Sequence, residues 1–337
     1  MMQNIKFTFL MAAYNAEKYI TEAIESAINQ TYGNFELLIL DDKSTDNTVN
    51  VVESFNDNRI RLVKLPHYGS GGKVRAEGYK YITGDYVQIL DADDYISPDL
   101  LENYVGALEK DSLDIIVPQP YSVTHGEIKR ITKTNEYLGK TIDGKTAFDL
   151  SIFWNLHAWM CVRKELLISV GYDYEDYRIK TDELNNRKLF FYANKVHVSQ
   201  GSYYYRTNES SVTRLRANFI KTVESLVDEK MLLEFATENA AECTQKKCRD
   251  LLIQNLFVYQ RKYDSYRSEL GKDDSQFVLR VLEGTYYVKE LRKGKYGINN
   301  LFGIVFWLSG NDYEKYSRVV SRLNKAYGCI KRNKNKA

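Results

Sequence analysis

Alternating strand and helix signals occupy the first ninety residues and constrain the fold of this 337-residue chain more than any other feature. Short apolar runs typical of buried strands occur at 6–12, 35–40, 60–65 and 86–90. Between them we expect a helix that Asn15 caps and that runs to about Asn29, a second helix capped by Thr45 or Asp46, and a third near 74–81. This alternation predicts right-handed crossovers and a mainly parallel sheet.

Two acidic clusters follow strands of this predicted sheet. Asp41 and Asp42 follow the second strand, and Asp91, Asp93 and Asp94 follow the fourth. Ligands bind beyond the carboxyl ends of the strands in such sheets. Three carboxylates within four positions repel one another unless water, a cationic neighbour or a metal ion stabilises them. The sequence therefore predicts a ligand site at this edge, with solvated loop acids as the alternative.

The rest of the chain divides into a mixed segment and a helical one. Strand-like runs at 114–120 and 195–206 flank a strand-then-helix pattern and a helix that opens with Asp182 and Glu183. From about residue 218 apolar residues recur at helical spacing in three stripes: Ile220, Val223, Val227 and Met231; Cys248, Leu252, Leu256 and Tyr259; and Val319, Leu323, Tyr327 and Ile330. We place a domain boundary near Leu215, which gives an α/β domain at 1–215 and a helical region at 216–337.

Charge and cysteine content narrow the class of protein. A net charge of +2 gives no reason to expect binding to nucleic acid. The segment 312–337 carries eight Lys or Arg residues, which fit either a solvated end or a contact with anionic lipid. The four scattered cysteines do not have zinc-site spacing and fit a reducing compartment. With no recognisable cleavage site near the N-terminus and no run of eighteen apolar residues, we expect a cytoplasmic protein with peripheral contact at the inner face of the cell membrane.

Several of these segments, taken together, resemble the family 2 glycosyltransferases. The segment LMAAYNAEKYITEAIESAINQTYGNFELLILDDKSTDNT resembles the opening of the family, and GDYVQILDADDYISPDLL resembles its Asp-x-Asp segment. The likeness is dense over 7–101 and looser to about 213, through AWMCVRKELL, KTDELNNRKLFF and YYYRTNESSVT. It implies a GT-A fold, with a Rossmann-like, mostly parallel sheet flanked by helices. It also implies transfer of a sugar from a nucleotide donor with inversion at the anomeric carbon.

The resemblance assigns roles to individual residues. Asp42 would hold the base, most often uracil, and Asp93 with Asp91 would hold the Mn²⁺ or Mg²⁺ ion that bridges the diphosphate. Asp182 would be the general base, with Glu183 as the rival. The nucleotide-sugar pocket would be formed by Ala12, Tyr14, Asn15, Glu17, Asp42, Arg75, Asp91 and Ala92.

The sequence departs from the family pattern at several of its positions. Ala12 stands where the family usually has Pro, Ala76 where it commonly has Asn, and Thr181 in place of the Glu of its Glu-Asp pair. The glycine turn before Arg75 is about one residue longer than usual. These departures keep open a catalytically degenerate module that binds carbohydrate or a protein partner.

Two other enzyme classes fit less well. A sugar nucleotidyltransferase would need a loop rich in glycine and basic residues after the first strand, where AAYNAEKY stands. A phosphatase with an Asp-x-Asp nucleophile would place Thr after the pair, where Asp94 and Tyr95 follow. The leading hypothesis is a metal-dependent, inverting transferase that moves a sugar, most often from a UDP-sugar, to a hydroxyl of a surface polysaccharide or glycolipid.

Four further side chains have two readings each. Trp154, His157 and Trp159 fit either stacking on an acceptor sugar or packing in the core. Arg206 fits either a contact with the donor diphosphate or a surface ion pair, and His197 is expected to be structural.

The helical region would bind the acceptor, a partner subunit or the membrane face.

Overall fold

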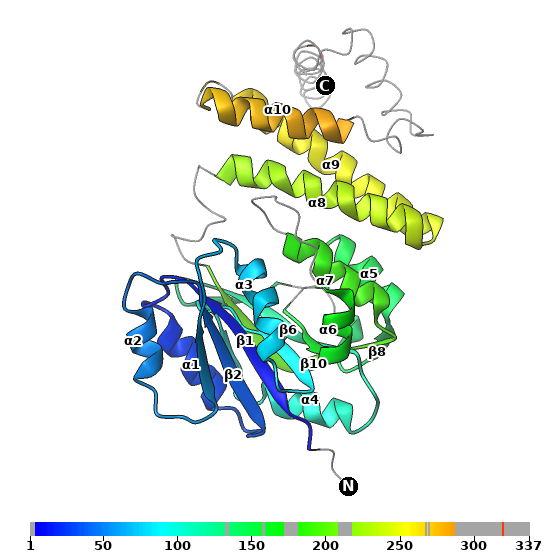
Figure 1. Cartoon of the computed structure of the whole chain (residues 1–337). Helices are drawn as coiled ribbons and strands as arrows, with labels where there is room; N and C mark the ends of the chain where they lie inside the picture. Colours follow the sequence, from blue (N-terminus) through cyan, green and yellow to red (C-terminus); the bar gives the residue numbers. More distant parts are fainter. Residues whose placement is uncertain are drawn as a thin grey trace. The chain divides into compact units, whose positions relative to one another are not determined.

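The computed structural model describes residues 4–131, 135–156, 159–171, 181–207, 218–266, 268, 270–286 and 319. The chain divides into two compact units, Met1–Ser211 and Val212–Ala337. The first unit has the alternation of strands and helices that the sequence predicts, and the second contributes helices (Figure 1).

A mixed sheet forms the centre of the first unit. Its described strands run in the order β3 (Ile60–Lys64), β2 (Phe35–Asp41), β1 (Phe7–Ala13), β4 (Tyr86–Ile89), β9 (Cys161–Arg163), β6 (Ile115–Thr124), β10 (Lys195–Arg206) and β5 (Tyr95–Ile96). The strands β3, β2, β1 and β4 are parallel, as predicted. The pair β6 and β10 is also parallel, and β9 joins the two halves by antiparallel pairing with β4 and β6.

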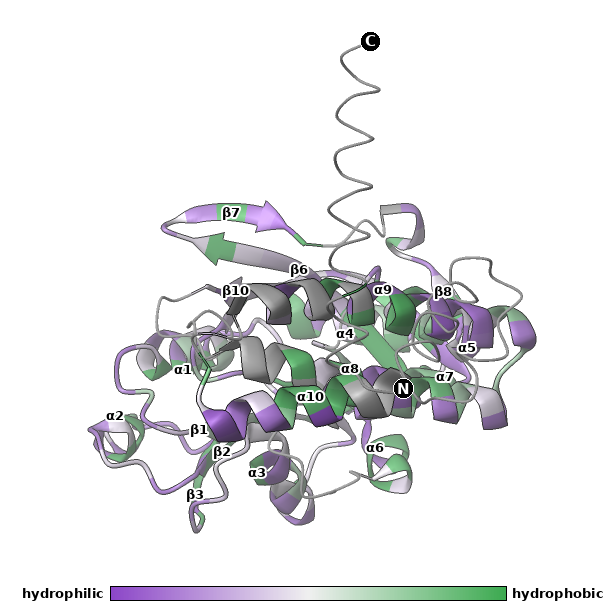
Figure 2. Ribbon diagram, turned by 90° about the horizontal axis from the view of Figure 1, so that it is seen from above, coloured by the Kyte–Doolittle hydropathy of each residue, from purple (hydrophilic) through white to green (hydrophobic). Residues whose placement is uncertain are grey.

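Two short strands extend the sheet beyond this order. The strand β7 (Glu127–Arg130) pairs with β6, and β8 (Thr141–Asp143) pairs with β10. Figure 2 shows β6 and β7 as a hairpin that runs past the edge of the sheet, with β7 mostly hydrophilic. The side chains of Glu127, Ile128 and Lys129 are exposed, in keeping with this position.

Helices cover both faces of the sheet. In the first unit they are α1 (Ile20–Ile28), α2 (Thr48–Glu53), α3 (Gly71–Gly78), α4 (Leu100–Leu108), α5 (Gly144–Ile152), α6 (Lys164–Val170) and α7 (Thr181–Tyr192), with short 3₁₀ turns η1 (Tyr79–Tyr81) and η2 (Asn135–Tyr137). Alternate residues of a strand point to opposite faces. Phe7 and Phe9 of β1 therefore pack with α1 and α4, whereas Leu10 faces α3. A Cβ on Gly78 would lie 2.3 Å from a methyl carbon of Leu40 and 3.2 Å from one of Leu10, so a larger residue at this position would force Leu40 to move.

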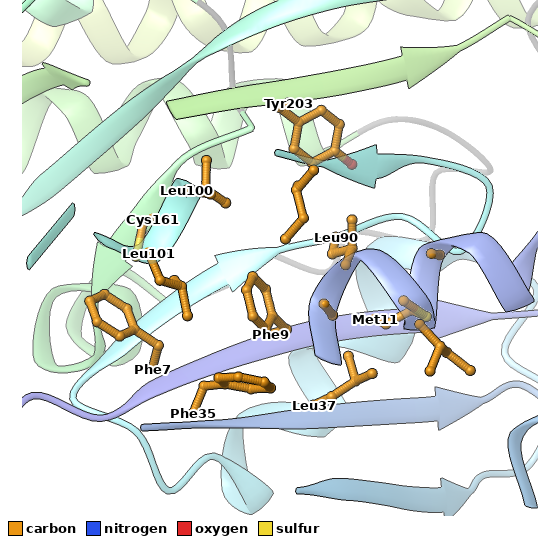
Figure 3. Close-up of a cluster of buried hydrophobic side chains, with 14 of the residues drawn as sticks. Phe7, Phe9, Met11, Phe35, Leu37, Leu90, Leu100, Leu101, Cys161 and Tyr203 are labelled. Atoms are coloured by element: carbon orange, nitrogen blue, oxygen red, sulfur yellow. The ribbon is translucent and has the colours of Figure 1, made fainter. Parts of the chain in front are cut away.

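The main hydrophobic core lies on the α1–α4 face of the sheet. Figure 3 shows Phe7, Phe9 and Met11 of β1 beside Phe35 and Leu37 of β2, with Leu100 and Leu101 of α4 nearby. Ile20, Ala23, Ile24 and Ala27 form the buried stripe of α1 that its spacing predicts. Burial of these side chains is the principal favourable term in folding such a domain, at about 25 cal/mol per Å² of apolar surface.

The predicted helix starts are wrong in detail. The helix α1 begins at Ile20 without a side-chain cap, so Asn15 does not cap it. Asn15 has a positive φ of 49°, and its Oδ1 instead accepts the N–H groups of Thr45 and Asp46. The helix α2 begins at Thr48 with Asn47 at its N-cap position, and the predicted Asp46 accepts the N–H of Thr48 at 2.9 Å from one position further back. The helix α3 begins at Gly71, capped by Ser70. The long-range bonds of Asn15 have no signal in local sequence.

The second unit contributes α8 (Asn218–Asn239), α9 (Glu242–Tyr266) and α10 (Lys272–Tyr286). The predicted stripe of α9, from Cys248 to Tyr259, is buried. In α8 the prediction is wrong in part, because Val227 is only partly buried whereas Leu226, Leu232 and Leu233 are buried. Because α8 contacts both α9 and α10, it buries a wider face than one stripe. Of the third predicted stripe, only Val319 lies within the described residues.

Among the described residues, no helix is both long and apolar enough to cross a membrane.

Candidate active site

The two acidic clusters lie at the same edge of the sheet. The strand β1 pairs in parallel with β2 on one side and with β4 on the other, so both neighbours end at one edge. Asp41 is the last residue of β2 and Asp42 follows it, and the segment Asp91–Asp94 follows β4. This arrangement, which the sequence predicts, places the acids where ligands bind in open α/β sheets.

Asp42 anchors the glycine-rich turn that follows β3. Its carboxylate accepts the backbone N–H of Tyr68 at 2.6 Å and that of Gly69 at 3.0 Å, and it lies 3.0 Å from Nδ1 of His67. The ring of His67 packs against that of Tyr14, with 4.7 Å between centroids, and Tyr14 is exposed. A carboxylate oxygen accepts more than one hydrogen bond. The predicted contact of Asp42 with a base therefore remains compatible with these bonds.

The loop after β1 is fastened to the loop after β2. Glu17 accepts the N–H of Asn47 at 2.9 Å, while its own N–H donates to Asp46 at 3.1 Å. Asn15 adds the bonds to Thr45 and Asp46 described above. Ala12, near the end of β1, pairs with Leu40 of β2. Of the predicted nucleotide-pocket residues, Asn15 and Glu17 thus lie in hydrogen-bonded loops beside Asp42, and Ala12 lies in the strand that leads into them.

A cation and hydrogen bonds to a buried carboxyl hold the acidic turn after β4. The guanidinium of Arg75, on α3, lies 2.6 Å from Oδ1 of Asp91, and both side chains are largely shielded from water. Asp94 is buried and accepts the O–H of Tyr203 at 2.8 Å and the N–H of Arg206 at 2.8 Å. Tyr203 in turn accepts the N–H of Asp91 at 3.1 Å. Burial, together with the charges of Asp91 and Asp93, raises the pKa of Asp94 well above its ordinary value.

Sequence reasoning did not find the role of Tyr203 and Asp94. Tyr203 lies on β10, 112 positions from Asp91, and pairs with Ile96 of β5. Successive side chains of a strand point to opposite faces, so three consecutive tyrosines at 203–205 signal that at least one ring faces inward. No local pattern indicates which buried group the inward ring contacts.

Asp91 and Asp93 are suited to a divalent cation that a substrate completes. Mg²⁺ and Mn²⁺ prefer oxygen ligands, and Mg²⁺ is commonly held by one or two carboxylates together with substrate phosphates and water. Among the described residues, no group of three His, Cys, Asp or Glu side chains is arranged to hold a metal ion alone. Asp93 is partly exposed, Asp91 keeps one oxygen outside its short contact with Arg75, and Ala92 between them is buried. This donor set fits a metal–diphosphate site.

A cavity of about 360 Å³ lies beside this turn, over β4 and β9 and bordered by α3, α6 and α7. Arg75 and Asp91 line one part of its wall, and Glu183, Asn185 and Asn186 of α7 line another. The structure thus brings α7 to the same cavity as the acidic turn. Asp182 lies in the first turn of α7, and its side chain lies outside the described residues. Glu183 lies 3.7 Å from the guanidinium of Arg187.

The structure describes three of the four side chains that had two readings, Trp154, Trp159 and Arg206. Trp159 stacks on Tyr203 and packs against the main core, whereas Trp154 is partly exposed on the cavity wall. Arg206 pairs with Glu22, which favours the ion-pair reading. Burial, then the charge of Lys110, lowers the pKa of His197, whose Nδ1 lies 3.0 Å from the hydroxyl of Thr141. His157 and the basic segment 312–337, apart from Val319, lie outside the described residues.

The curled mixed sheet, with acids beyond its parallel strands and a cavity beside them, defines an α/β protein of the GT-A class. Residues 8–171 match the family model described as glycosyl transferase family 2. This segment, about half of the chain, belongs to glycosyltransferase family 2.

Curated relatives cover different parts of the chain. Glycosyltransferase GlyA of Streptococcus pneumoniae is 27% identical over 241 residues, which are 68% of this chain and 34% of GlyA. WfgD of Escherichia coli, a UDP-Glc:α-D-GlcNAc-diphosphoundecaprenol β-1,3-glucosyltransferase, is 26% identical over 209 residues, 56% of this chain and 83% of WfgD. The chain thus spans about a third of GlyA and most of WfgD.

Solved structures show the same fold. The crystal structure of Staphylococcus aureus TarS 1–349 in complex with UDP superposes with a TM-score of 0.67 and 18% identity. The superposition covers 96% of this chain and 92% of that chain.

Proposed function

We propose that this protein is a metal-dependent, inverting glycosyltransferase. It moves a sugar from a nucleotide donor, with a UDP-sugar as the first candidate, to a hydroxyl of a surface polysaccharide or glycolipid. One observation carries the proposal: a single cavity is lined by the Arg75–Asp91 pair after β4 and by the start of α7. Family membership, the UDP complex of the structural relative TarS and the UDP-Glc donor in the name of WfgD support the choice of donor.

The donor would lie along the edge of the sheet. The nucleotide would lie against the residues at the ends of β1 and β2, with Asp42 at the base and Ala12, Tyr14, Asn15 and Glu17 along its side. Arg75, Asp91 and Ala92 would border the diphosphate and ribose. Asp91 and Asp93 would hold Mn²⁺ or Mg²⁺, which when bound neutralises the charge that develops on the leaving diphosphate.

The acceptor would enter from the side of α7. Its hydroxyl must face the anomeric carbon from the side opposite the leaving group, as inversion requires. Asp182 accepts the hydroxyl proton as the new bond forms, and no covalent intermediate is needed. Glu183, the rival base, is held toward Arg187 at 3.7 Å, which favours a supporting role. The Asp182→Asn variant should bind UDP normally and lose about 10²- to 10⁴-fold in kcat, whereas Glu183→Gln should lose far less.

A thermal-shift screen tests the donor assignment. UDP, GDP, dTDP and CMP are each added with and without Mn²⁺ to the wild type and to Asp93→Ala. Ligand at about a hundred times its Kd stabilises a fold by roughly 2.7 kcal/mol, which gives a readily measured shift. We expect a Mn²⁺-dependent shift with UDP that Asp93→Ala abolishes. No shift with any nucleotide would instead favour the binding module without catalysis, as would the absence of UDP-sugar hydrolysis or transfer.

The helical region at 216–337 would bind the acceptor, a partner subunit or the cytoplasmic face of the membrane. The membrane option rests on the basic residues between 312 and 337. Pelleting with liposomes that contain anionic lipid tests it. If truncation after Gly310 leaves the pelleted fraction unchanged, the basic segment is not the contact.

A further inference from the structure

The hydroxyl of Tyr203 is a buried polar group whose two hydrogen bonds both go to the acidic turn after β4. It donates to Oδ2 of Asp94 at 2.8 Å and accepts the backbone N–H of Asp91 at 3.1 Å. A phenol hydroxyl can act as donor and as acceptor, and this one does both. The hydroxyl therefore joins the two ends of the turn that contains Asp93.

The ring of Tyr203 is fixed by packing that does not involve its hydroxyl. The side chain is fully buried in the same hydrophobic cluster as Leu90 (Figure 3) and stacks on Trp159, with 5.3 Å between ring centroids. A phenylalanine ring would fill the same space. Because burying a polar group costs stability unless it is hydrogen-bonded, packing alone does not explain why the core ring carries a hydroxyl. Its two bonds point to a role in the turn.

Strand β10 holds this turn at both of its ends. After the turn, β5 pairs antiparallel with β10, and the backbone N–H of Arg206 on β10 donates to Oδ1 of Asp94 at 2.8 Å. At the start of the turn, the hydroxyl of Tyr203 reaches the backbone of Asp91. Asp93 lies in sequence between these two fixed ends. The backbone of the turn is thus set by a strand that lies far away in sequence.

The bonds of this turn suit a metal site whose ligands are arranged in advance. Asp91 has its backbone N–H bound by Tyr203 and one carboxylate oxygen close to Arg75, which leaves its other oxygen for an ion. Asp94 is buried and uses both carboxylate oxygens within the protein, so it is unsuited to be a ligand. Partners behind metal ligands orient them, and losing one typically lowers metal affinity about 10- to 100-fold.

We propose that Tyr203 and Asp94 are positioning residues that set the affinity of the acidic turn for its divalent cation by fixing Asp91 and Asp93 relative to each other. This rests on the proposed transferase function, to which the metal–diphosphate site belongs. Neither Tyr203 nor Asp94 would bind the ion itself. Their mutual hydrogen bond, and the bond from Asp91 to Tyr203, would hold the turn in its binding conformation before the ion and the nucleotide arrive.

A Mn²⁺ titration of the full chain tests the role of Tyr203. Bound Mn²⁺ is followed by its enhancement of water proton relaxation, with UDP in fixed excess. We expect Tyr203→Phe to need at least about tenfold more Mn²⁺ for half-saturation than the wild type, because the turn loses a partner behind its ligands. Saturating Mn²⁺ should restore the full signal. A purely structural role would lower Tm without changing the Mn²⁺ concentration at half-saturation.

Tyr104→Phe is the matched control. Tyr104 is also fully buried, and its hydroxyl donates to Oε1 of Gln88 at 2.8 Å, within the core and not at the turn. Each variant loses one buried hydroxyl, so both should fall in Tm by similar amounts. Tyr104→Phe should change the half-saturating Mn²⁺ concentration less than twofold. An equal change in both variants, or no change in Tyr203→Phe, overturns the proposal.

Asp94→Asn tests the other half of the pair. Asparagine keeps the shape of the side chain and can still accept from Arg206, but its Nδ2 is a donor where the carboxylate accepts from Tyr203. We expect a loss of Mn²⁺ affinity similar to that of Tyr203→Phe. Since the two residues act through one hydrogen bond, the double variant should lose little more than either single variant. Losses that add fully would overturn the pairing.

The wild type provides the result that separates the two proposals. If Mn²⁺ and UDP give no relaxation enhancement with the wild type, the proposed transferase function fails and the positioning role fails with it. If the wild type binds both and Tyr203→Phe needs no more Mn²⁺ than Tyr104→Phe, the positioning role alone is overturned.

Discussion

At the scale of single residues, the acidic turn after β4 shows how one short segment accommodates three carboxylates. Asp91 has a cationic neighbour in Arg75, and Asp94 is removed from solvent and bonded to Tyr203 and Arg206. Asp93, between them in sequence, is partly exposed at the edge where a ligand would bind. Each acid therefore has a different environment, which separates a structural role for Asp94 from the proposed metal-binding role of the other two.

Arg75 should contribute both to this turn and to donor binding. Replacing it by Gln leaves Asp91 without its close cation and removes a positive group from the proposed diphosphate site. We expect the affinity for UDP in Mn²⁺ to fall about tenfold, since charged hydrogen bonds contribute about 1.5–3 kcal/mol. Titration calorimetry measures the affinity. Lys80→Gln removes an exposed positive charge five positions away, in η1, and should change the affinity less than twofold. Equal losses in both variants would contradict a specific role for Arg75.

At the scale of the elements, one buried acid ties together the first half of the sheet. Glu36 of β2 accepts the hydroxyl of Thr8 on β1 at 2.7 Å, the N–H of Thr83 at 2.7 Å and a bond from Arg61 on β3 at 2.7 Å. Burial alone would raise the pKa of Glu36, but the bonds from Arg61, Thr83 and Thr8 outweigh it and hold the pKa below its ordinary value of 4.5. The charged form is therefore the one that stabilises the fold.

Glu36→Gln should destabilise the protein by about 2 kcal/mol at neutral pH, because a buried group loses charged hydrogen bonds. A depressed folded-state pKa gives stability that is present above the ordinary value and is lost as pH falls through the folded-state value. The wild type should thus lose more stability than the variant as pH falls below about 4.5. Urea unfolding at several pH values measures this.

The exposed pair of Glu53 and Lys64 gives the control for this prediction. Glu53→Gln should cost less than about 0.5 kcal/mol, since exposed ion pairs contribute little. Equal pH dependence in the wild type and in Glu36→Gln would show that the charge of Glu36 does not stabilise the sheet.

Local sequence patterns predicted the strands and helices better than the pairing of the strands and the long-range hydrogen bonds. The runs around Phe7, Phe35, Ile60 and Tyr86 became parallel strands, because each is a short apolar run flanked by helical spacing. The antiparallel insertion of β9 between β4 and β6 was not predictable, since three residues carry no register signal. In the same way, Asp42 and Asp91 were identifiable as strand-end acids. The bonds of Asn15 to Thr45 and of Tyr203 to Asp94 span 30 and 109 positions, which no local spacing encodes.

At the scale of the whole molecule, the candidate site belongs to one unit. Every described residue that lines the cavity lies within Met1–Ser211, as do the acids at the sheet edge. The unit Val212–Ala337 has buried apolar residues of its own, among them Val223 on α8, Leu252 on α9 and Leu282 on α10. Donor binding should therefore depend on the first unit, and the stability of the helices on a separate set of contacts.

Leu252→Ala tests this division. Leu252 is fully buried in α9, so its truncation should destabilise the helical unit by about 2–5 kcal/mol. Thermal unfolding followed by circular dichroism should show an earlier loss of helix, while the affinity for UDP in Mn²⁺ stays within twofold of the wild type. Gln254→Ala, at an exposed position of the same helix, should change neither quantity. A tenfold loss of UDP affinity in Leu252→Ala, at a temperature where its helix content is still native, would show that the helical unit takes part in donor binding.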